Sequence, residues 1–71
     1  MLIKLITGQF CSRCHMISPK LKAFAEANWY EYVEKDVQQA TPEDLGDATM
    51  LPVIRWNGEM IDFDEALVRL S

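Results

Sequence analysis

The pattern of hydrophobic and polar positions divides the chain into short elements with two different periods. Residues 2–6 form a mostly apolar run of Leu, Ile, Lys, Leu and Ile, which Thr7 and Gly8 end. Such a run predicts a central strand that is buried on both faces. From Ser12 to about Asn28 the apolar positions recur at helical spacing and predict an amphipathic helix. The apolar positions of this helix are Cys14, Ile17, Leu21, Phe24 and Ala25.

Residues 30–37 are rich in strand-forming side chains and predict a second strand. A strand, a helix and a strand of these lengths form a β-α-β unit, in which the strands are parallel and the crossover is right-handed. Pro19 lies inside the predicted helix, where it removes one backbone hydrogen bond and should bend the helix axis.

The chain then predicts a short helix that begins after a capping residue. Thr41 is a favourable cap, Pro42 suits the first helical position, and Gly46 ends the helix soon afterwards. Acidic residues near the starts of the predicted helices are best explained as charges that favour a helix N-terminus. These residues are Glu43, Asp44, Asp64 and Glu65.

Residues 51–56 and 59–63 predict two strands, which Asn57 and Gly58 join. Asn-Gly between two strand-like runs is a strong hairpin signal, because both turn positions need a positive φ. Residues 64–70 predict a closing helix. The order of elements is therefore β-α-β-α-β-β-α, which predicts an α/β fold.

Length and composition limit the possible classes of protein. The chain has 71 residues and predicts a single domain over residues 1–71, because a domain needs roughly 50 to 200 residues. Apolar residues make up 49% and charged residues 25%, which is typical of globular proteins. The formal charge of -4 disfavours nucleic acid and anionic membrane surfaces as partners. No apolar run approaches the ~20 residues of a membrane span.

The first residues do not form the apolar segment of a signal peptide, since Gly8 ends the run too early. Two cysteines are also too few for a disulfide-stapled secreted scaffold. We therefore expect a cytoplasmic protein, unless a leader has been removed.

The two cysteines, Cys11 and Cys14, are separated by two residues and carry the most informative chemistry of the chain. Cys11 falls where the loop after the first strand meets the helix N-terminus, whose free N–H groups and dipole stabilise an anion. Arg13 adds a positive charge nearby. Cys14 is in phase with the apolar side of the helix, so its sulfur should point inward. The hypothesis is that Cys11 attacks a substrate disulfide and Cys14 then resolves the mixed disulfide.

Three other interpretations of the pair remain open. A passive disulfide would add only about 2 kcal/mol of stability for so short a loop, and the cytosol keeps such bonds reduced. Cys11, Cys14 and His15 also fit the signature of c-type haem attachment, with His15 as an axial ligand. A zinc site needs four ligands, so carboxylates or a dimer would have to complete the set of two Cys and one His.

Beyond this spacing, the chain resembles the thioredoxin superfamily over essentially its whole length. The redox motif of that family corresponds to residues 10–14 (Phe-Cys-Ser-Arg-Cys), and its helix-kinking proline corresponds to Pro19. The proline that lies against the cysteine pair in that family corresponds to Pro52, and the hairpin turn corresponds to residues 57–59. The chain is similar to the smaller, glutaredoxin-sized version of the fold, without an extra N-terminal strand and helix.

The resemblance implies a thioredoxin-like α/β fold with a four-stranded mixed sheet and a cis peptide bond before Pro52. It implies thiol–disulfide exchange by Cys11 and Cys14, with no cofactor and no metal ion. The residues that it implies for substrate binding are Phe10, Ser12, Arg13, Leu51 and Pro52. Met50 and Met60 are further candidates for an apolar rim around Cys11.

Several positions depart from the family pattern. Ser12 and Arg13 replace the Gly-Pro of thioredoxins and the Pro-Tyr of glutaredoxins, which help to set the reduction potential. The buried acid that thioredoxins carry six positions before the first cysteine falls at Leu5, so that proton acceptor is missing. His15 and Lys35 are alternative proton relays, although a solvent-facing His and a solvated strand Lys are the simpler interpretations.

The Gly-Gly pair of glutathione-binding glutaredoxins falls near Asp62 and Phe63 and is absent. Asp62 and Asp64 would repel the carboxylates of glutathione. The sequence therefore predicts that a thioredoxin-reductase-type enzyme is a better electron donor than glutathione.

The leading hypothesis is a small, monomeric thiol–disulfide oxidoreductase that reduces disulfide-bearing protein substrates. The alternative is a non-catalytic module that binds a partner through the Pro52 edge and uses its cysteines as a redox sensor. Repeated turnover of a disulfide substrate would distinguish the two. The remaining aromatic residues predict packing in the core or against the sheet, and they are Trp29, Tyr30, Tyr32 and Trp56.

Overall fold

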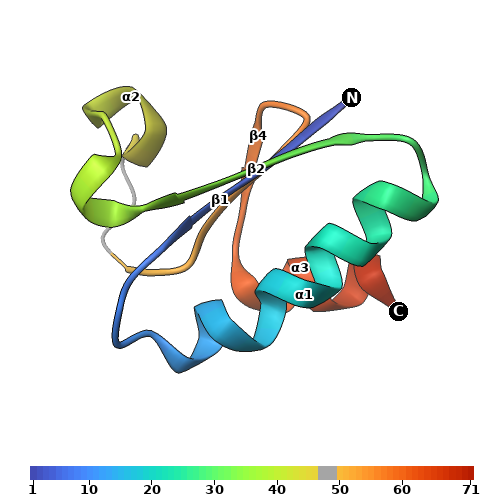
Figure 1. Ribbon diagram of the computed structural model, residues 1–71, viewed down its shortest axis with the longest axis horizontal. Helices are drawn as coiled ribbons and strands as arrows, with labels where there is room; N and C mark the ends of the chain where they lie inside the picture. The colour runs from blue at the N-terminus through green and yellow to red at the C-terminus, as the bar shows by residue number, and fades with distance from the viewer. Residues whose placement is uncertain (47–49) are drawn as a thin grey trace.

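This computed structural model describes residues 1–46 and 50–71. Their strands form one mixed four-stranded sheet (Figure 1). The central strand β1 (Leu2–Thr7) is parallel to β2 (Glu31–Asp36) and antiparallel to β3 (Val53–Trp56). The edge strand β4 (Glu59–Ile61) is antiparallel to β3, which gives the order β2-β1-β3-β4. This sheet confirms the predicted α/β arrangement.

Three helices in the described part of the chain complete the predicted order of elements. The long helix α1 (Ser12–Ala27) connects β1 to β2 and lies beside α3 (Phe63–Leu70) on one side of the sheet (Figure 1). The single-turn helix α2 (Pro42–Leu45) follows the 3-10 turn η1 (Val37–Gln39) and lies away from α1 and α3. No helix among these residues has the length and apolar character needed to cross a membrane.

The apolar core lies between the sheet and the two helices α1 and α3. Ile3 and Leu5 of β1 are fully buried in this layer. Lys4 and Ile6 alternate with them and point to the opposite face of the sheet. Ile6 is fully buried there, but the Lys4 side chain is 24% exposed, so the expectation that β1 is buried on both faces is wrong at Lys4. The core cluster consists of Ile3, Leu5, Ile17, Leu21, Ala25, Ile54, Ile61 and Ala66.

The end of α1 explains why one residue predicted to pack against the core lies in solvent. The backbone N–H of Tyr30 donates to the Ala25 carbonyl at 2.8 Å, and that of Trp29 donates to the Glu26 carbonyl at 3.4 Å. This pair of bonds closes the helix with Trp29 in the left-handed region (φ 61) and Tyr30 against the Phe24 ring, 5.9 Å between centroids. The Trp29 side chain is 95% exposed, so its predicted packing is wrong. The other three aromatic residues pack against the core as expected, namely Tyr30, Tyr32 and Trp56.

Capping side chains decide two element boundaries that the sequence pattern places elsewhere. The Asp62 carboxylate accepts a hydrogen bond from the Glu65 N–H at 2.7 Å, so α3 begins at Phe63, a residue that the pattern assigns to a strand. Asp36 caps the 3-10 turn in the same way and ends β2 before Val37. The boundary of a helix that a side chain caps depends on which of several competing hydrogen bonds forms. Apolar periodicity does not reveal which bond that is.

The predicted hairpin and the predicted short helix are both confirmed. Asn57 and Gly58 join β3 to β4 with φ angles of 54 and 88, as an Asn-Gly turn requires. The Thr41 hydroxyl accepts from the Asp44 N–H, and the Asp44 carboxylate accepts from the Thr41 N–H. This capping box starts α2, and Gly46 (φ 57) ends it.

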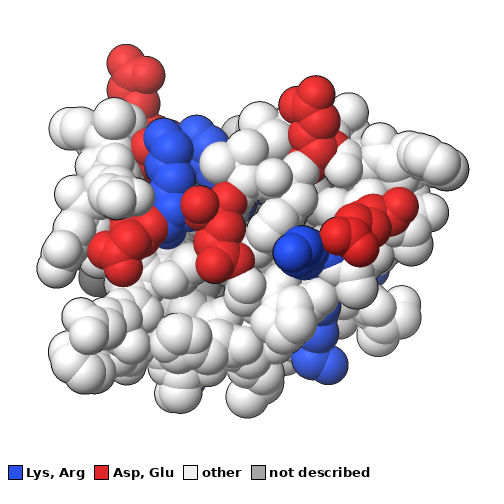
Figure 2. All heavy atoms as spheres, viewed as in Figure 1, with Lys and Arg blue, Asp and Glu red and all other residues white. Residues whose placement is uncertain are grey.

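Asp44 also joins α2 to the second face of the sheet. Its carboxylate lies 2.6 Å from the Lys4 ammonium and 3.3 Å from the Lys35 ammonium, and its side chain is 8% exposed. Figure 2 shows basic and acidic side chains interleaved on this part of the surface. Asp44 is therefore more than a helix N-terminal charge, and Lys35 is ion-paired rather than simply solvated. The hydrogen bond from Lys4 is the main reason why the pKa of Asp44 lies well below its usual range.

This ionic cluster predicts a specific loss of stability in acid. A carboxyl group whose pKa is lowered in the folded state stabilises the fold above its ordinary pKa of about 4, and the stabilisation is lost as the pH falls below that value. Asp44→Asn keeps a cap acceptor but removes the charge, so we expect the variant to be less stable than the native protein at pH 7. The difference should shrink between about pH 5 and pH 2 in urea unfolding experiments.

Glu26→Gln is the matched control, since it removes one exposed carboxylate from α1 outside the cluster. Its stability relative to the native protein should change little over the same pH range. A stability difference for Asp44→Asn that is constant with pH would contradict the ionic explanation.

Candidate redox site

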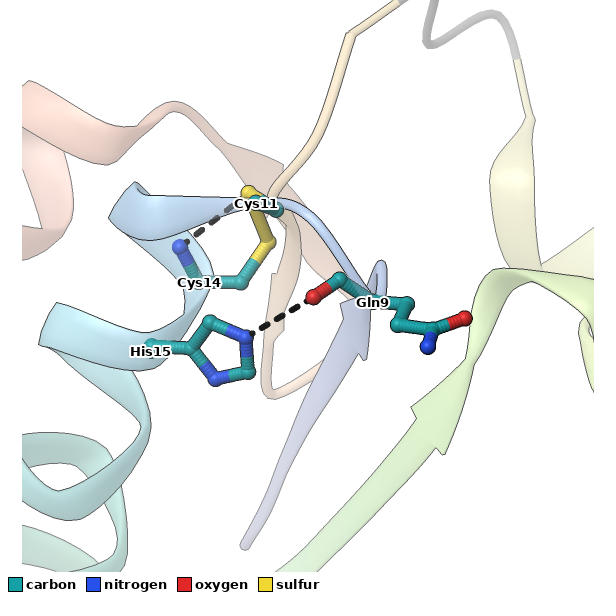
Figure 3. Close-up of a disulfide and its surroundings, with 4 residues drawn as sticks. All are labelled: Gln9, Cys11, Cys14 and His15. Atoms are coloured by element: carbon teal, nitrogen blue, oxygen red, sulfur yellow. Dashed lines mark hydrogen bonds between the residues drawn. A yellow bond between two sulfur atoms is a disulfide. The ribbon is translucent and has the colours of Figure 1, made fainter.

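The two cysteines form a disulfide at the N-terminus of α1 (Figure 3). Cys11 is the N-cap residue with an extended backbone, and Cys14 lies in the first turn, with 5.2 Å between their Cα atoms. Cys14 is fully buried, whereas Cys11 is half-buried. The expectation that Cys14 points inward is confirmed.

The helix N-terminus contacts the Cys11 sulfur directly. The backbone N–H of Cys14 donates to Cys11 Sγ at 3.1 Å (Figure 3). The sulfur thus takes the part that a Ser or Asp oxygen usually plays in a helix cap. A donor aimed at this atom and the positive end of the helix dipole both favour a negative charge on it.

Two hydrogen bonds hold the loop that leads to Cys11. The Cys11 N–H donates to the Gly8 carbonyl at 3.3 Å and closes a turn. His15, on the first turn of α1, is exposed, and its Nε2 lies 3.2 Å from the Gln9 carbonyl oxygen (Figure 3). The tautomer protonated at Nε2 donates this hydrogen bond. His15 is therefore solvent-facing as expected, and its contact is with the loop backbone.

Ser12 and Arg13, between the cysteines, are both exposed. The Arg13 guanidinium lies over the Phe63 ring at the start of α3, 5.7 Å from its centroid. This cation–π contact connects the redox motif to the closing helix. The sequence pattern does not indicate the contact of Phe63 with Arg13, because the pattern assigns Phe63 to a strand.

Pro52 is buried, and its peptide bond with Leu51 is cis, as the resemblance implies. Leu51 packs on the turn that precedes the cysteines. A Cβ atom added to Gly8 would lie 2.7 Å from Leu51 Cδ1 and 3.8 Å from Cys11 Cβ. Gly8 therefore permits the close approach of the two loops, and it is a site residue that the sequence indicates only as the end of a strand.

A groove of about 500 Å³ begins beside this contact. Among the predicted substrate-binding residues, Arg13, Leu51 and Pro52 line it, and Phe10 and Ser12 do not. Phe10 instead projects into solvent next to Cys11, with a side chain that is 95% exposed. The complete lining is Arg13, Met50, Leu51, Pro52, Val53, Met60, Ile61, Asp62, Phe63 and Asp64.

The position of the buried thioredoxin acid is apolar in this chain. Leu5 is fully buried and belongs to the core cluster. Within residues 1–46 and 50–71, no three His, Cys, Asp or Glu side chains come together in a group that could hold a metal ion. The chemistry that the described site offers is that of two neighbouring sulfur atoms with unequal exposure.

The contact between Gly8 and Leu51 predicts a coupled response to mutation. Gly8→Ala should displace the Leu51 side chain and destabilise the protein by about 1 kcal/mol, because a Cβ atom at 2.7 Å forces Leu51 to move. Leu51→Ala removes the obstructing methyl group, so the double variant should lose less stability than the sum of the two single variants. Urea unfolding of the four proteins measures this coupling, and additive losses would show that the loops do not press on one another.

Comparisons with known proteins support the fold. No protein-family model matches the chain, and no curated protein matches it. Among solved structures, the chain is similar to the oxidized form of mitochondrial thioredoxin 3 from Saccharomyces cerevisiae, with 24% sequence identity and a TM-score of 0.60. The match covers 86% of this chain and 61% of the yeast chain, so this chain spans less than two thirds of that protein. The chain therefore has the thioredoxin-like fold.

Proposed function

We propose that the protein is a thiol–disulfide oxidoreductase that reduces protein disulfides through Cys11 and Cys14. The observation that carries the proposal is the unequal placement of the two sulfur atoms at one helix N-terminus. Cys11 is half-buried and accepts a backbone N–H, whereas Cys14 is fully buried behind it. A two-step exchange needs one accessible, stabilised thiolate and one thiol that is shielded from other reactants.

The proposed reaction begins with both cysteines reduced. The Cys11 thiolate attacks one sulfur of the substrate disulfide, which forms a mixed disulfide and releases the other substrate sulfur as a thiolate. Cys14 then loses its proton and attacks Cys11 Sγ, which releases the second substrate thiolate. Two electrons pass to the substrate, which becomes a dithiol after protonation. The protein ends with the Cys11–Cys14 disulfide that the structure contains.

The groove beside the pair supports a protein or peptide as substrate. Leu51 and Pro52 line the groove, Leu51 packs on the turn that leads to Cys11, and exposed Met50 extends the apolar surface. An extended segment laid in this groove would bring its disulfide to the accessible sulfur. We propose that the protein acts as a monomer in the cytoplasm, where an electron donor returns the disulfide to the dithiol state.

A second candidate function is a redox sensor that binds a partner and does not turn over. The observation in its favour is the apolar, fully buried Leu5, because it leaves Cys14 without the acid that the resemblance implies at that position. Slow deprotonation of Cys14 would leave Cys11 in a long-lived mixed disulfide. Repeated reduction of insulin disulfides in the presence of a dithiol would support the enzyme, and a single turnover would support the sensor.

The assignment of roles predicts a large difference in thiol reactivity. Alkylation of the reduced protein near neutral pH should modify Cys11 about 100-fold faster than Cys14, because Cys11 alone combines access with the helix N–H donor. Mass spectrometry of the alkylated peptides measures both rates. Cys14→Ser should accumulate mixed disulfides through Cys11, and Cys11→Ser should accumulate none. Equal alkylation rates would overturn the assignment.

The start of α3 predicts the electron donor. Asp62 and Asp64 both lie on the groove, and their charges would repel the carboxylates of glutathione. We expect the oxidised protein to be reduced faster by NADPH with a flavin-dependent thioredoxin reductase than by millimolar glutathione with glutathione reductase. NADPH consumption monitors both reactions. Efficient glutathione-driven reduction would contradict this expectation and leave the dithiol mechanism intact.

A further inference from the structure

The groove beside the cysteines is lined by apolar and by charged side chains, here named its apolar wall and its charged wall. Met50, Leu51, Pro52 and Met60 provide the apolar side. The charged wall consists of Arg13, the α3 cap residue Asp62, and Asp64 in the first turn of α3. The groove therefore offers a substrate two different kinds of contact.

The apolar wall discriminates weakly between side chains. Met50 is 69% exposed and Met60 is 37% exposed, so both thioethers are free to adapt to what lies against them. Methionine is unbranched and polarisable, and surfaces rich in it accept many apolar shapes. The charged wall is the part of the groove that can discriminate between protein substrates by charge.

The charged wall is negative. The Arg13 guanidinium lies over the Phe63 ring, 5.7 Å from its centroid, which places it near the start of α3. Asp62 uses one carboxylate oxygen to accept the Glu65 N–H at 2.7 Å, and its second oxygen remains available. Asp64 is exposed and makes no side-chain hydrogen bond within the described residues. Two carboxylates thus face one guanidinium along this wall, on a chain whose formal charge is -4.

We propose that this wall selects substrate disulfides that have a lysine or arginine next to the attacked cysteine, and that it disfavours acidic neighbours. The inference rests on the proposed function and adds the class of substrate to it. A basic side chain laid along α3 would meet Asp64 and the free oxygen of Asp62, whereas an acidic one would meet two like charges. Complementary charge at the rim of an interface gives specificity and faster association.

The first experiment measures turnover with three disulfide peptides that differ at one residue beside the reactive cysteine, which is Lys, Gln or Glu. We expect kcat/KM in the order Lys, Gln, Glu, with about a threefold to tenfold range at low salt. The range should collapse at about 0.5 M salt, because exposed charges are then screened. Equal values for the Lys and Glu peptides at low salt would overturn the inference and leave the proposed function standing.

The second experiment measures binding without chemistry. The same peptides with serine in place of cysteine are titrated into the ¹⁵N-labelled oxidised protein, and amide shifts give the Kd. The Lys peptide should bind more tightly than the Glu peptide, with the largest shifts at Leu51, Phe63 and Asp64. The titration measures this difference in affinity even if the protein reduces no peptide. Absence of reduction would reject the proposed function alone. Equal affinities would reject the inference alone.

Two variants locate the preference on the groove. Asp64→Asn should reduce the ratio of Lys to Glu affinities by about half or more, because it removes the carboxylate with no other hydrogen bond. Glu26→Gln is the matched control, since it makes the same change of net charge on an exposed part of α1 that does not line the groove. An equal effect of both variants would show that net charge, and not the groove, sets the preference.

Discussion

The capping of α1 by the Cys11 sulfur is the interaction on which the candidate site depends. It exists because β1 ends at Thr7, a turn from Gly8 to Cys11 reverses the chain, and the helix begins at the next residue. The same geometry that leaves Cys11 half-buried at the cap places Cys14 on the inner side of the first turn. One helix N-terminus thus assigns different environments to two identical side chains, and the proposed division of labour follows from that difference.

The two faces of the sheet hold the protein together by different means. Apolar side chains from β1, α1 and α3 fill one face, while the other face has the Lys4–Asp44–Lys35 cluster beside buried Ile6 and Val53. Burying apolar area is insensitive to pH, and the ion pairs are not. The side of the molecule that carries α2 is therefore the part whose stability responds to acid, and it lies on the face of the sheet opposite to α1.

The sequence predicts the features that repeat or that have strong local chemistry. Apolar periodicity places β1 and α1, Asn57-Gly58 places the hairpin, and the spacing of Cys11 and Cys14 identifies the reactive pair. Features that depend on a single competing contact are not predictable in this way. Trp29 is exposed because the backbone that closes α1 directs Tyr30 inward instead, and the place of Phe63 beside Arg13 follows from the cap at Asp62. The contact of Gly8 with Leu51 joins loops more than 40 residues apart in the sequence, so no local sequence pattern predicts it.

The apolar residue Leu5 affects the second chemical step of the proposed mechanism, in which Cys14 loses its proton. Without an acid at position 5, the proton of Cys14 goes to another base when the mixed disulfide of the proposed reaction resolves. The substrate thiolate released in the first step is such a base, and its affinity for a proton is similar to that of an ordinary cysteine. It can serve only while it stays near the pair, so a substrate held by Leu51, Pro52 and the charged wall would resolve faster than one held loosely. In the proposed mechanism, binding in the groove would therefore favour completion of the exchange, so the groove would affect turnover as well as the choice of substrate.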